Sequence, residues 1–195
     1  MRKIVVAVAA LAFLAPSHAH AVAFVGARVG YALPSGDIAK NAPIKDVVKS
    51  NVPIQVDAGL SVLSILSAGI YGSYAPTQFK STFKDTECPS CSGQNLRLGV
   101  QVNLRPPVVL KSLWGGVFAG LEQQSVKGGP VDGQVRGWEA GLQAGWDFSL
   151  LPLIGIGPFV SYSLGQFTTA TGNASIPEKA QHQTLTLGLR AIFEL

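Results

Sequence analysis

The chain of 195 residues is apolar and nearly neutral, with 47% hydrophobic residues, 13% charged residues and a formal net charge of +4. This small charge, with no cluster of Lys and Arg, gives no support for a nucleic-acid-binding protein. After the N-terminal leader, no stretch reaches the about 18 uninterrupted apolar residues that indicate a transmembrane helix. An apolar chain of this kind can still cross a membrane as a closed β-barrel.

Residues 1–21 have the pattern of a secretory signal peptide. Two basic residues are followed by an apolar run from Ile4 to Leu14 and by the small-x-small motif Ala19-His20-Ala21. The apolar run is shorter than the about 20 residues of a membrane-spanning helix, although an uncleaved anchor is an alternative. We therefore expect one exported domain, residues 22–195, whose formal charge falls from +4 to +2 with the loss of the two basic residues.

Alternation of apolar with small or polar residues predicts eight strands. It is clearest in Trp138–Phe148, where every even-numbered residue is apolar and the odd-numbered ones are Glu, Gly, Gln, Gly and Asp. A period of two indicates a strand with one apolar and one polar face. In chain order, the predicted strands are Phe24–Leu33, Ile54–Val62, Leu66–Tyr74, Leu96–Arg105, Gly116–Glu122, Trp138–Phe148, Ile156–Phe167 and Thr184–Leu195.

The connections between these strands alternate in length. Short links at Leu63-Ser64, Arg105–Leu113 and Ser149–Gly155 are expected to face the periplasm. Short periplasmic turns and longer extracellular loops are typical of outer-membrane barrels. The four long polar connections are expected to be extracellular loops: Pro34–Val52, Ala75–Gln94, Gln123–Gln134 and Thr168–Gln183.

The leader, the eight alternating strands, the four long loops and a last strand with Phe193 and a hydrophobic final residue resemble the small outer-membrane β-barrel superfamily. That superfamily includes the OmpA transmembrane domain, OmpX and OmpW; here Leu195 replaces the usual terminal aromatic residue. The resemblance covers the mature chain and rests on pattern, without a diagnostic motif. It implies an all-β, eight-stranded antiparallel transmembrane barrel with up-and-down meander topology. It also implies the outer membrane of a Gram-negative bacterium, with lipid and lipopolysaccharide around the barrel and the barrel-assembly machinery as a partner during biogenesis.

A soluble periplasmic barrel or sandwich is the alternative, and it would expose the charged face of each strand. Glycine weakens a strand on an exposed face, whereas a narrow lumen needs small residues, so the glycines of this face favour the membrane barrel. They are Gly26, Gly30, Gly59, Gly69, Gly99, Gly120, Gly141, Gly145 and Gly188.

The same strand phase turns nine charged side chains into the lumen. An eight-stranded barrel has an interior that side chains just fill, and buried charges are costly unless they pair or stay hydrated. We therefore expect a plugged interior, with a narrow ion path or an OmpW-type conduit for small hydrophobic molecules as alternatives. The predicted lumen charge network consists of Arg28, Asp57, Arg97, Arg105, Glu122, Glu139, Asp147, Arg190 and Glu194.

Outward aromatic residues are expected to mark the two membrane interfaces. Trp138 and Trp146 lie on one face, eight residues apart. This separation is about 27 Å along the strand, or about 21 Å along the axis of a barrel whose strands tilt by about 40°. With Tyr31 and Tyr74, they form the predicted aromatic girdle.

Cys88 and Cys91 form a Cys-x-x-Cys motif in the second long loop. A catalytic dithiol requires a helix N-terminus in an α/β fold, and zinc requires four ligands, whereas His182 is the only mature histidine. Both stay as alternatives. Export favours a disulfide between the two cysteines, which would stiffen the loop.

The expected function is an envelope-structural or surface-interaction role through the outer loops, without enzymatic activity, cofactor, metal or nucleic acid, and with a monomeric chain. Porin-like or OmpW-like transport is the first alternative. The second is a lipid A-modifying enzyme with His182, Thr184 and Glu178 near the outer rim. The strand phase turns the first two inward, whereas lipid substrates approach from the outward face. A solvated loop histidine is therefore favoured over a catalytic one. Neither a ligand nor a surface partner is indicated by the sequence.

Overall fold

The computed structural model describes residues 21–39, 42–63, 65–82, 89–106, 112–128, 131–172 and 180–195. Residues 1–20 of the predicted signal peptide lie outside this part, so its cleavage stays a prediction. Within the described residues, no helix has the length and hydropathy that would carry it across a membrane.

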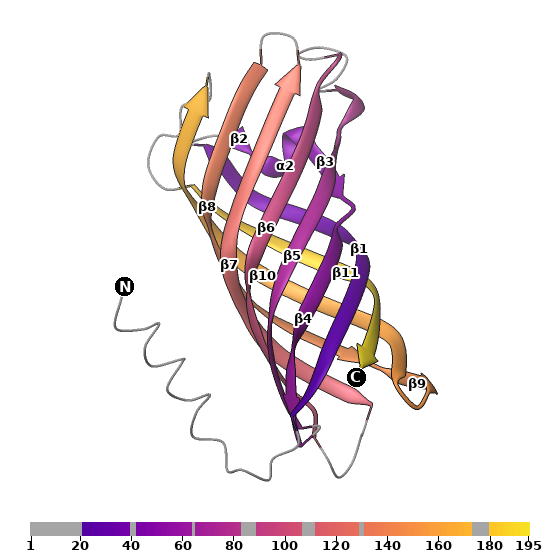
Figure 1. Ribbon diagram of the computed structural model, residues 1–195. Coiled ribbons are helices and arrows are strands. Elements are labelled where there is room, and N and C mark those ends of the chain that lie inside the picture. The colour runs from indigo at the N-terminus through magenta and orange to yellow at the C-terminus, as the bar shows by residue number, and fades with distance from the viewer. Residues whose placement is uncertain are drawn as a thin grey trace, which may run out of the picture.

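Eight long strands form one antiparallel sheet that closes on itself (Figure 1). Successive strands pair with each other around the ring, and β1 also pairs with β11, from Phe24 opposite Glu194 to Gly36 opposite His182. The predicted all-β up-and-down barrel is thus confirmed. Its strands are β1 (Ala21–Ala39), β4 (Ile54–Val62), β5 (Leu66–Phe79), β6 (Ser92–Leu104), β7 (Leu113–Gly128), β8 (Val131–Trp146), β10 (Ile154–Gly172) and β11 (Gln181–Glu194).

Four short elements complete the fold: β2 (Ala42–Pro43), α2 (Ile44–Val47), β3 (Val48–Asn51) and β9 (Phe148–Leu151). The first three lie at the outer end of the barrel, and β9 lies at the opposite end near the carboxyl terminus (Figure 1). β3 leads into β4 through Val52 and Pro53. The ladder is interrupted there because proline has no backbone N–H, while the Pro53 carbonyl accepts a hydrogen bond from the Gly30 N–H.

Three of the predicted outer loops are much shorter in the structure, because the strands beside them are longer. β7 ends at Gly128 and β8 begins at Val131, so paired backbone occupies most of the predicted Gln123–Gln134 loop. β5 likewise extends to Phe79 and β10 to Gly172. Beyond the lipid, the outward face of a strand no longer needs apolar residues, so the period that marks the lower strands stops there, although the backbones of the extensions still pair.

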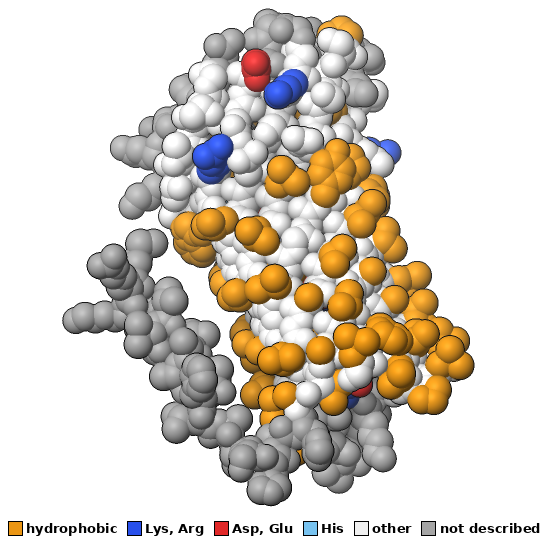
Figure 2. Space-filling view, viewed as in Figure 1, with side chains coloured by type: hydrophobic (Ala, Val, Ile, Leu, Met, Phe, Trp, Pro, Cys, Tyr) orange, Lys and Arg blue, Asp and Glu red, His pale blue; other side chains and the backbone are white. Residues whose placement is uncertain are grey.

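Large apolar side chains cover the outside of the barrel below these extensions. Leu98, Leu121 and Leu142 are 65%, 68% and 64% exposed. Figure 2 shows hydrophobic side chains around the lower part of the barrel, whereas the upper end is mostly polar. An apolar surface this continuous requires an apolar environment. An outward apolar band is what a barrel presents to lipid, and the predicted strand phase, with Leu142 facing out, is the one observed.

Candidate functional site

All nine charged residues of the predicted lumen network lie on the inward face, in three groups along the barrel axis. Glu139, Gln143 and Asp147 follow one another at intervals of four residues on the inward side of the chain, and each belongs to a different group. Four residues of a strand span about 14 Å, so the groups occupy successive levels of the lumen.

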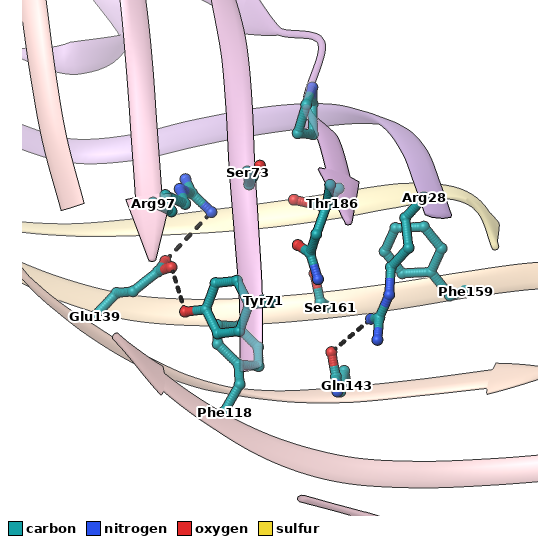
Figure 3. A pocket seen from close by; sticks show the side chains of 12 residues that line it. Arg28, Tyr71, Ser73, Arg97, Phe118, Glu139, Gln143, Phe159, Ser161 and Thr186 are labelled. Atoms are coloured by element: carbon teal, nitrogen blue, oxygen red, sulfur yellow. Dashed lines mark hydrogen bonds and ion pairs between the residues drawn. The ribbon is translucent and has the colours of Figure 1, made fainter. Parts of the chain in front are cut away.

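The outer group joins β5, β6, β7, β8 and β11. Glu139 accepts a hydrogen bond from the Tyr71 hydroxyl at 3.0 Å and lies 3.2 Å from Nη1 of Arg97 (Figure 3). Arg97 Nε lies 3.9 Å from Oε2 of Glu122, whose other oxygen contacts Nε2 of His182. Arg97 thus faces two buried carboxylates, those of Glu139 and Glu122. The ring of His182 contacts the carboxylate of Glu122.

The position of His182 corrects the expectation of a solvated loop histidine. β11 begins at Gln181, before the predicted start at Thr184, so the inward phase of the strand extends to His182. The ring is 5% exposed and stacks on Phe167 with a centroid distance of 4.2 Å and an angle of 19°. Thr184 also faces inward, and Glu178 lies outside the described residues.

Tyr71 belongs to the outer group, although it is not among the residues predicted for the lumen. Its ring lies against Gly99 and Gly120, where an added Cβ would come within 2.7 Å of Tyr71 Cε1 and 2.5 Å of Tyr71 Oη. Two predicted lumen glycines therefore make room for one aromatic ring. The inward phase of the predicted strand Leu66–Tyr74 was the signal that could have identified this tyrosine.

Arg28 is the centre of the middle group. Its Nε lies 2.6 Å from Asp57 Oδ2, while Nη1 and Nη2 donate to the amide oxygens of Gln143 at 2.8 Å and Gln101 at 2.9 Å. Gln143 Nε2 in turn donates to Oδ1 of Asn103 at 2.6 Å. All these side chains are buried. The guanidinium thus ties four strands together across the lumen.

Trp114 forms the floor of the middle group and was missed because the predicted strand began at Gly116. The guanidinium carbons of Arg190 and Arg28 lie 4.3 and 5.3 Å from its ring centroid. Its Nε1 donates to Oδ1 of Asp147 at 3.0 Å. The ring is 1% exposed, so it fills the lumen at this level. Extension of the inward phase by two residues would have identified it.

The inner group closes the periplasmic end with a chain of ion pairs. Arg105 Nη2 lies 3.2 Å from Asp147 Oδ2, and its Nη1 lies 3.0 Å from Glu194 Oε1. Arg190 Nη1 lies 3.4 Å from the same Asp147 oxygen. Arg105 and Arg190 therefore share the carboxylate of Asp147. Arg105 also pairs with a second carboxylate, that of Glu194.

The three groups leave little free volume between them. Among the described residues, the cavity between the outer and middle groups has a volume of about 30 Å³, and Arg28, Tyr71, Arg97 and Glu139 are among the residues that line it (Figure 3). A space of this size accommodates one or two water molecules. The described side chains thus leave room for little more than water at this level, and the plugged interior stays a prediction.

Three of the four predicted girdle residues face outward: Trp138, Tyr31 and Tyr74 are 46%, 44% and 45% exposed. Trp146 is partly buried and stacks on Phe148, with ring centroids 6.2 Å apart. The two tryptophans therefore differ in how much of the ring they offer to the membrane interface.

Cys91 is buried in a small cluster at the outer end with Ile44, Val48 and Phe79. No cysteine among the described residues is free. The other cysteine, Cys88, lies outside the described residues, so the disulfide between Cys88 and Cys91 stays a prediction.

A second candidate site is a concave polar surface on the outside of the wall, above the apolar band. This outer polar hollow has a volume of about 600 Å³ and is formed by the outer ends of β6, β7, β8 and β10. All of its lining residues belong to predicted outer loops, and none of them was predicted as a site residue. Its lining residues are Gln94, Gln123, Ser125, Lys127, Asp132, Gly133, Gln134, Thr171 and Gly172.

No protein-family model matches the chain, and no curated protein matches its sequence. The fold is similar to the crystal structure of Neisserial surface protein A, with a TM-score of 0.63, 12% identity and coverage of 89% of this chain and 97% of the other. It is also similar to the solid-state NMR structure of AlkL in DMPC bilayers, with a TM-score of 0.56, 12% identity and 93% coverage of both chains.

A third similar structure is Ail of Yersinia pestis in complex with the heparin analogue sucrose octasulfate. Its TM-score is 0.50 at 14% identity, with coverage of 88% of this chain and 99% of the other. At identities this low, the structural similarity shows a shared fold. With the closed ring of strands and the apolar outer band, this similarity leads to one conclusion: the chain has the fold of the small eight-stranded outer-membrane β-barrels.

Proposed function

We propose that this barrel has a closed interior and works at the outer surface of the cell envelope, through the polar wall that its strands build above the lipid. The observation that carries the proposal is the continuation of β7 and β8 as a paired ladder as far as Gly128 opposite Val131, well beyond the apolar band. A barrel that served only to occupy the membrane would not need this polar, strand-paired extension above the apolar band.

The outer wall suits recognition because its backbone is already ordered. The paired strands hold their side chains at fixed positions, and a surface that is rigid before binding loses less conformational entropy on association. β10 contributes as far as Gly172, which pairs with Gly133 of β8. The wall is therefore a preformed platform.

The interior supports a surface role over a pore. Arg28 and Asp57, 4% and 0% exposed, sit at mid-lumen beside Trp114, and an ion passing this level would have to displace them. Separating two buried charges leaves each without compensation in a low-dielectric interior, so this pair opposes opening of the lumen.

The contacts of His182 do not favour a lipid-modifying enzyme. Its Nε2 is engaged by Glu122 and its ring is covered by Phe167, inside the lumen. Lipid substrates approach from the outside of the wall, so the proposed function includes no catalytic role for this histidine. The mass of lipid A is expected to be the same in cells that express the wild type and His182→Ala.

Planar-bilayer recording of the refolded, heat-modifiable protein tests the closed interior. We expect insertion without discrete current steps. Reproducible steps that disappear when the protein is left unfolded would contradict the proposal and favour a narrow pore.

The surface role is tested in a deletion strain through the sensitivity of the cells to detergent. Complementation by the wild type should restore resistance, and a failure to do so would contradict an envelope role.

A further inference from the structure

The outer polar hollow is built from one continuous row of side chains across four strands. Gln94 of β6 lies opposite Ser125 of β7, Ser125 opposite Gln134 of β8, and Gln134 opposite Thr171 of β10. Residues opposite each other in a sheet point to the same face. Amide and hydroxyl groups from four strands are thereby presented side by side on the outside of the wall.

This row lies just above the level of the membrane interface. On β8, Gln134 precedes the outward-facing Trp138 by four residues, and Trp138 lies opposite Leu121 in the apolar band. Four residues span about 14 Å along a strand, or about 10 Å along the axis at a tilt of about 40°. Tryptophan on such barrels marks the interface, so the hollow faces sideways at the height of the polar headgroups.

Basic side chains flank the row. Lys127 lines the hollow at its upper edge, opposite Asp132 in the register. Arg136 lies one row below Gln134, opposite Gln123, with an exposed side chain. Within the described part of the chain, no ion pair occupies its guanidinium. Among the described lining residues, Asp132 is the only acidic one and Lys127 the only basic one, so Arg136 beside the lining gives this part of the wall a net positive charge.

These groups match a phosphorylated saccharide. Glutamine amides and serine or threonine hydroxyls both donate and accept, as the hydroxyl groups of sugars require. An arginine guanidinium offers paired donors to a phosphate, and lysine adds a point charge. None of the described lining residues has a large apolar side chain for an acyl chain or a hydrophobic solute.

The ligand at this height beside the barrel is the phosphorylated saccharide part of lipopolysaccharide, the lipid of the outer leaflet. We propose that the outer polar hollow binds this saccharide, with Gln134 and its row neighbours on the sugar hydroxyls and with Arg136 and Lys127 on the phosphates. The inference rests on the proposed function, since it names the partner of the same outer wall. The barrel would thereby be fixed to its neighbouring lipopolysaccharide molecules.

Native mass spectrometry of the detergent-refolded barrel tests the proposal. The probe is purified deep-rough lipopolysaccharide, compared with the same material after enzymatic dephosphorylation and with phosphatidylglycerol. We expect saturable binding of the phosphorylated probe, at least about tenfold weaker binding after dephosphorylation, and no saturable binding of phosphatidylglycerol. Charge-assisted hydrogen bonds are strong enough for a loss of this size.

Two variants locate the site. Arg136→Gln and Gln134→Ala should each weaken binding of the phosphorylated probe, the first by about tenfold and the second by several-fold. Lys49→Gln is the matched control, because Lys49 is an exposed lysine of β3 outside the hollow. The affinity of this variant for the phosphorylated probe should equal that of the wild type. Heat modifiability of each variant establishes that it has folded.

Equal binding by Arg136→Gln and wild type, or equal binding of phosphatidylglycerol, would overturn the inference. Tighter binding of a delipidated inner-core oligosaccharide than of intact lipopolysaccharide would also overturn it, because a soluble glycan would then be the occupant. These results are independent of the planar-bilayer recording, so loss of the saccharide site and failure of the closed interior can be told apart.

Discussion

Nε of Arg28 lies 2.6 Å from Oδ2 of Asp57, and both side chains are buried at the centre of the barrel. The same guanidinium also bonds Gln143, 115 residues away in the sequence. A single residue therefore links the first strand to the opposite wall, and several consequences of this interior can be measured.

Arg28→Met should destabilise the folded barrel by about 3–5 kcal/mol, because it leaves the Asp57 carboxylate buried without its charge partner. Urea unfolding in detergent, followed by tryptophan fluorescence, measures the change. The double variant Arg28→Met with Asp57→Asn should be more stable than Arg28→Met alone, since the unpaired charge is removed. A double variant as unstable as the sum of the two single changes would show that the pair is not coupled.

Gly120→Ala should displace the Tyr71 ring, because the new Cβ would lie 2.5 Å from its hydroxyl oxygen and 2.6 Å from the Leu98 carbonyl. Overpacking of this kind costs about 1–3 kcal/mol, and the hydrogen bond to Glu139 would be lost as well. Gly72→Ala is the control, since an added Cβ there meets nothing within 4 Å. Equal unfolding midpoints for the two variants would argue against close packing of the tyrosine.

Leu142→Arg places a charge on the lipid face and should impair folding into bilayers by about 2–4 kcal/mol if the site is near the midplane. Leu142 is 64% exposed on the outside of the barrel. Gln134→Arg, on the same face of β8 above the apolar band, should fold nearly as well as the wild type. Refolding yields by heat modifiability in lipid vesicles distinguish the two; normal yield for Leu142→Arg would mean that this face does not contact lipid.

Non-reducing mass spectrometry of the exported protein should find the peptides of Cys88 and Cys91 linked. Closure of so short a loop contributes about 2 kcal/mol on the chain-entropy model, so Cys91→Ser should lower the stability modestly. Two free thiols in exported protein would refute the disulfide.

The alternation of residues was enough to predict the strands inside the membrane and the direction of their side chains. A strand in lipid must turn apolar groups outward, so parity alone assigned Leu142 to the outside and Arg28 and Glu139 to the lumen. Tyr71 and Trp114 obey the same parity, but Trp114 lies before the predicted start of its strand and was missed. The sequence could not reveal the outer extensions, because a strand that faces water on the outside no longer needs the outward apolar residues that mark a strand in lipid.

The contact partners of the lumen side chains, and the level of each residue along the barrel axis, depended on the closed ring of strands. Glu139 meets Tyr71 from 68 residues away, and His182 meets Glu122, only because the shear of the barrel brings their strands to one level. The row from Gln94 to Thr171 likewise exists only in the register of four paired strands. Local alternation therefore determined which side of the wall each residue faces, whereas the long-range register of the closed sheet decided which residues meet.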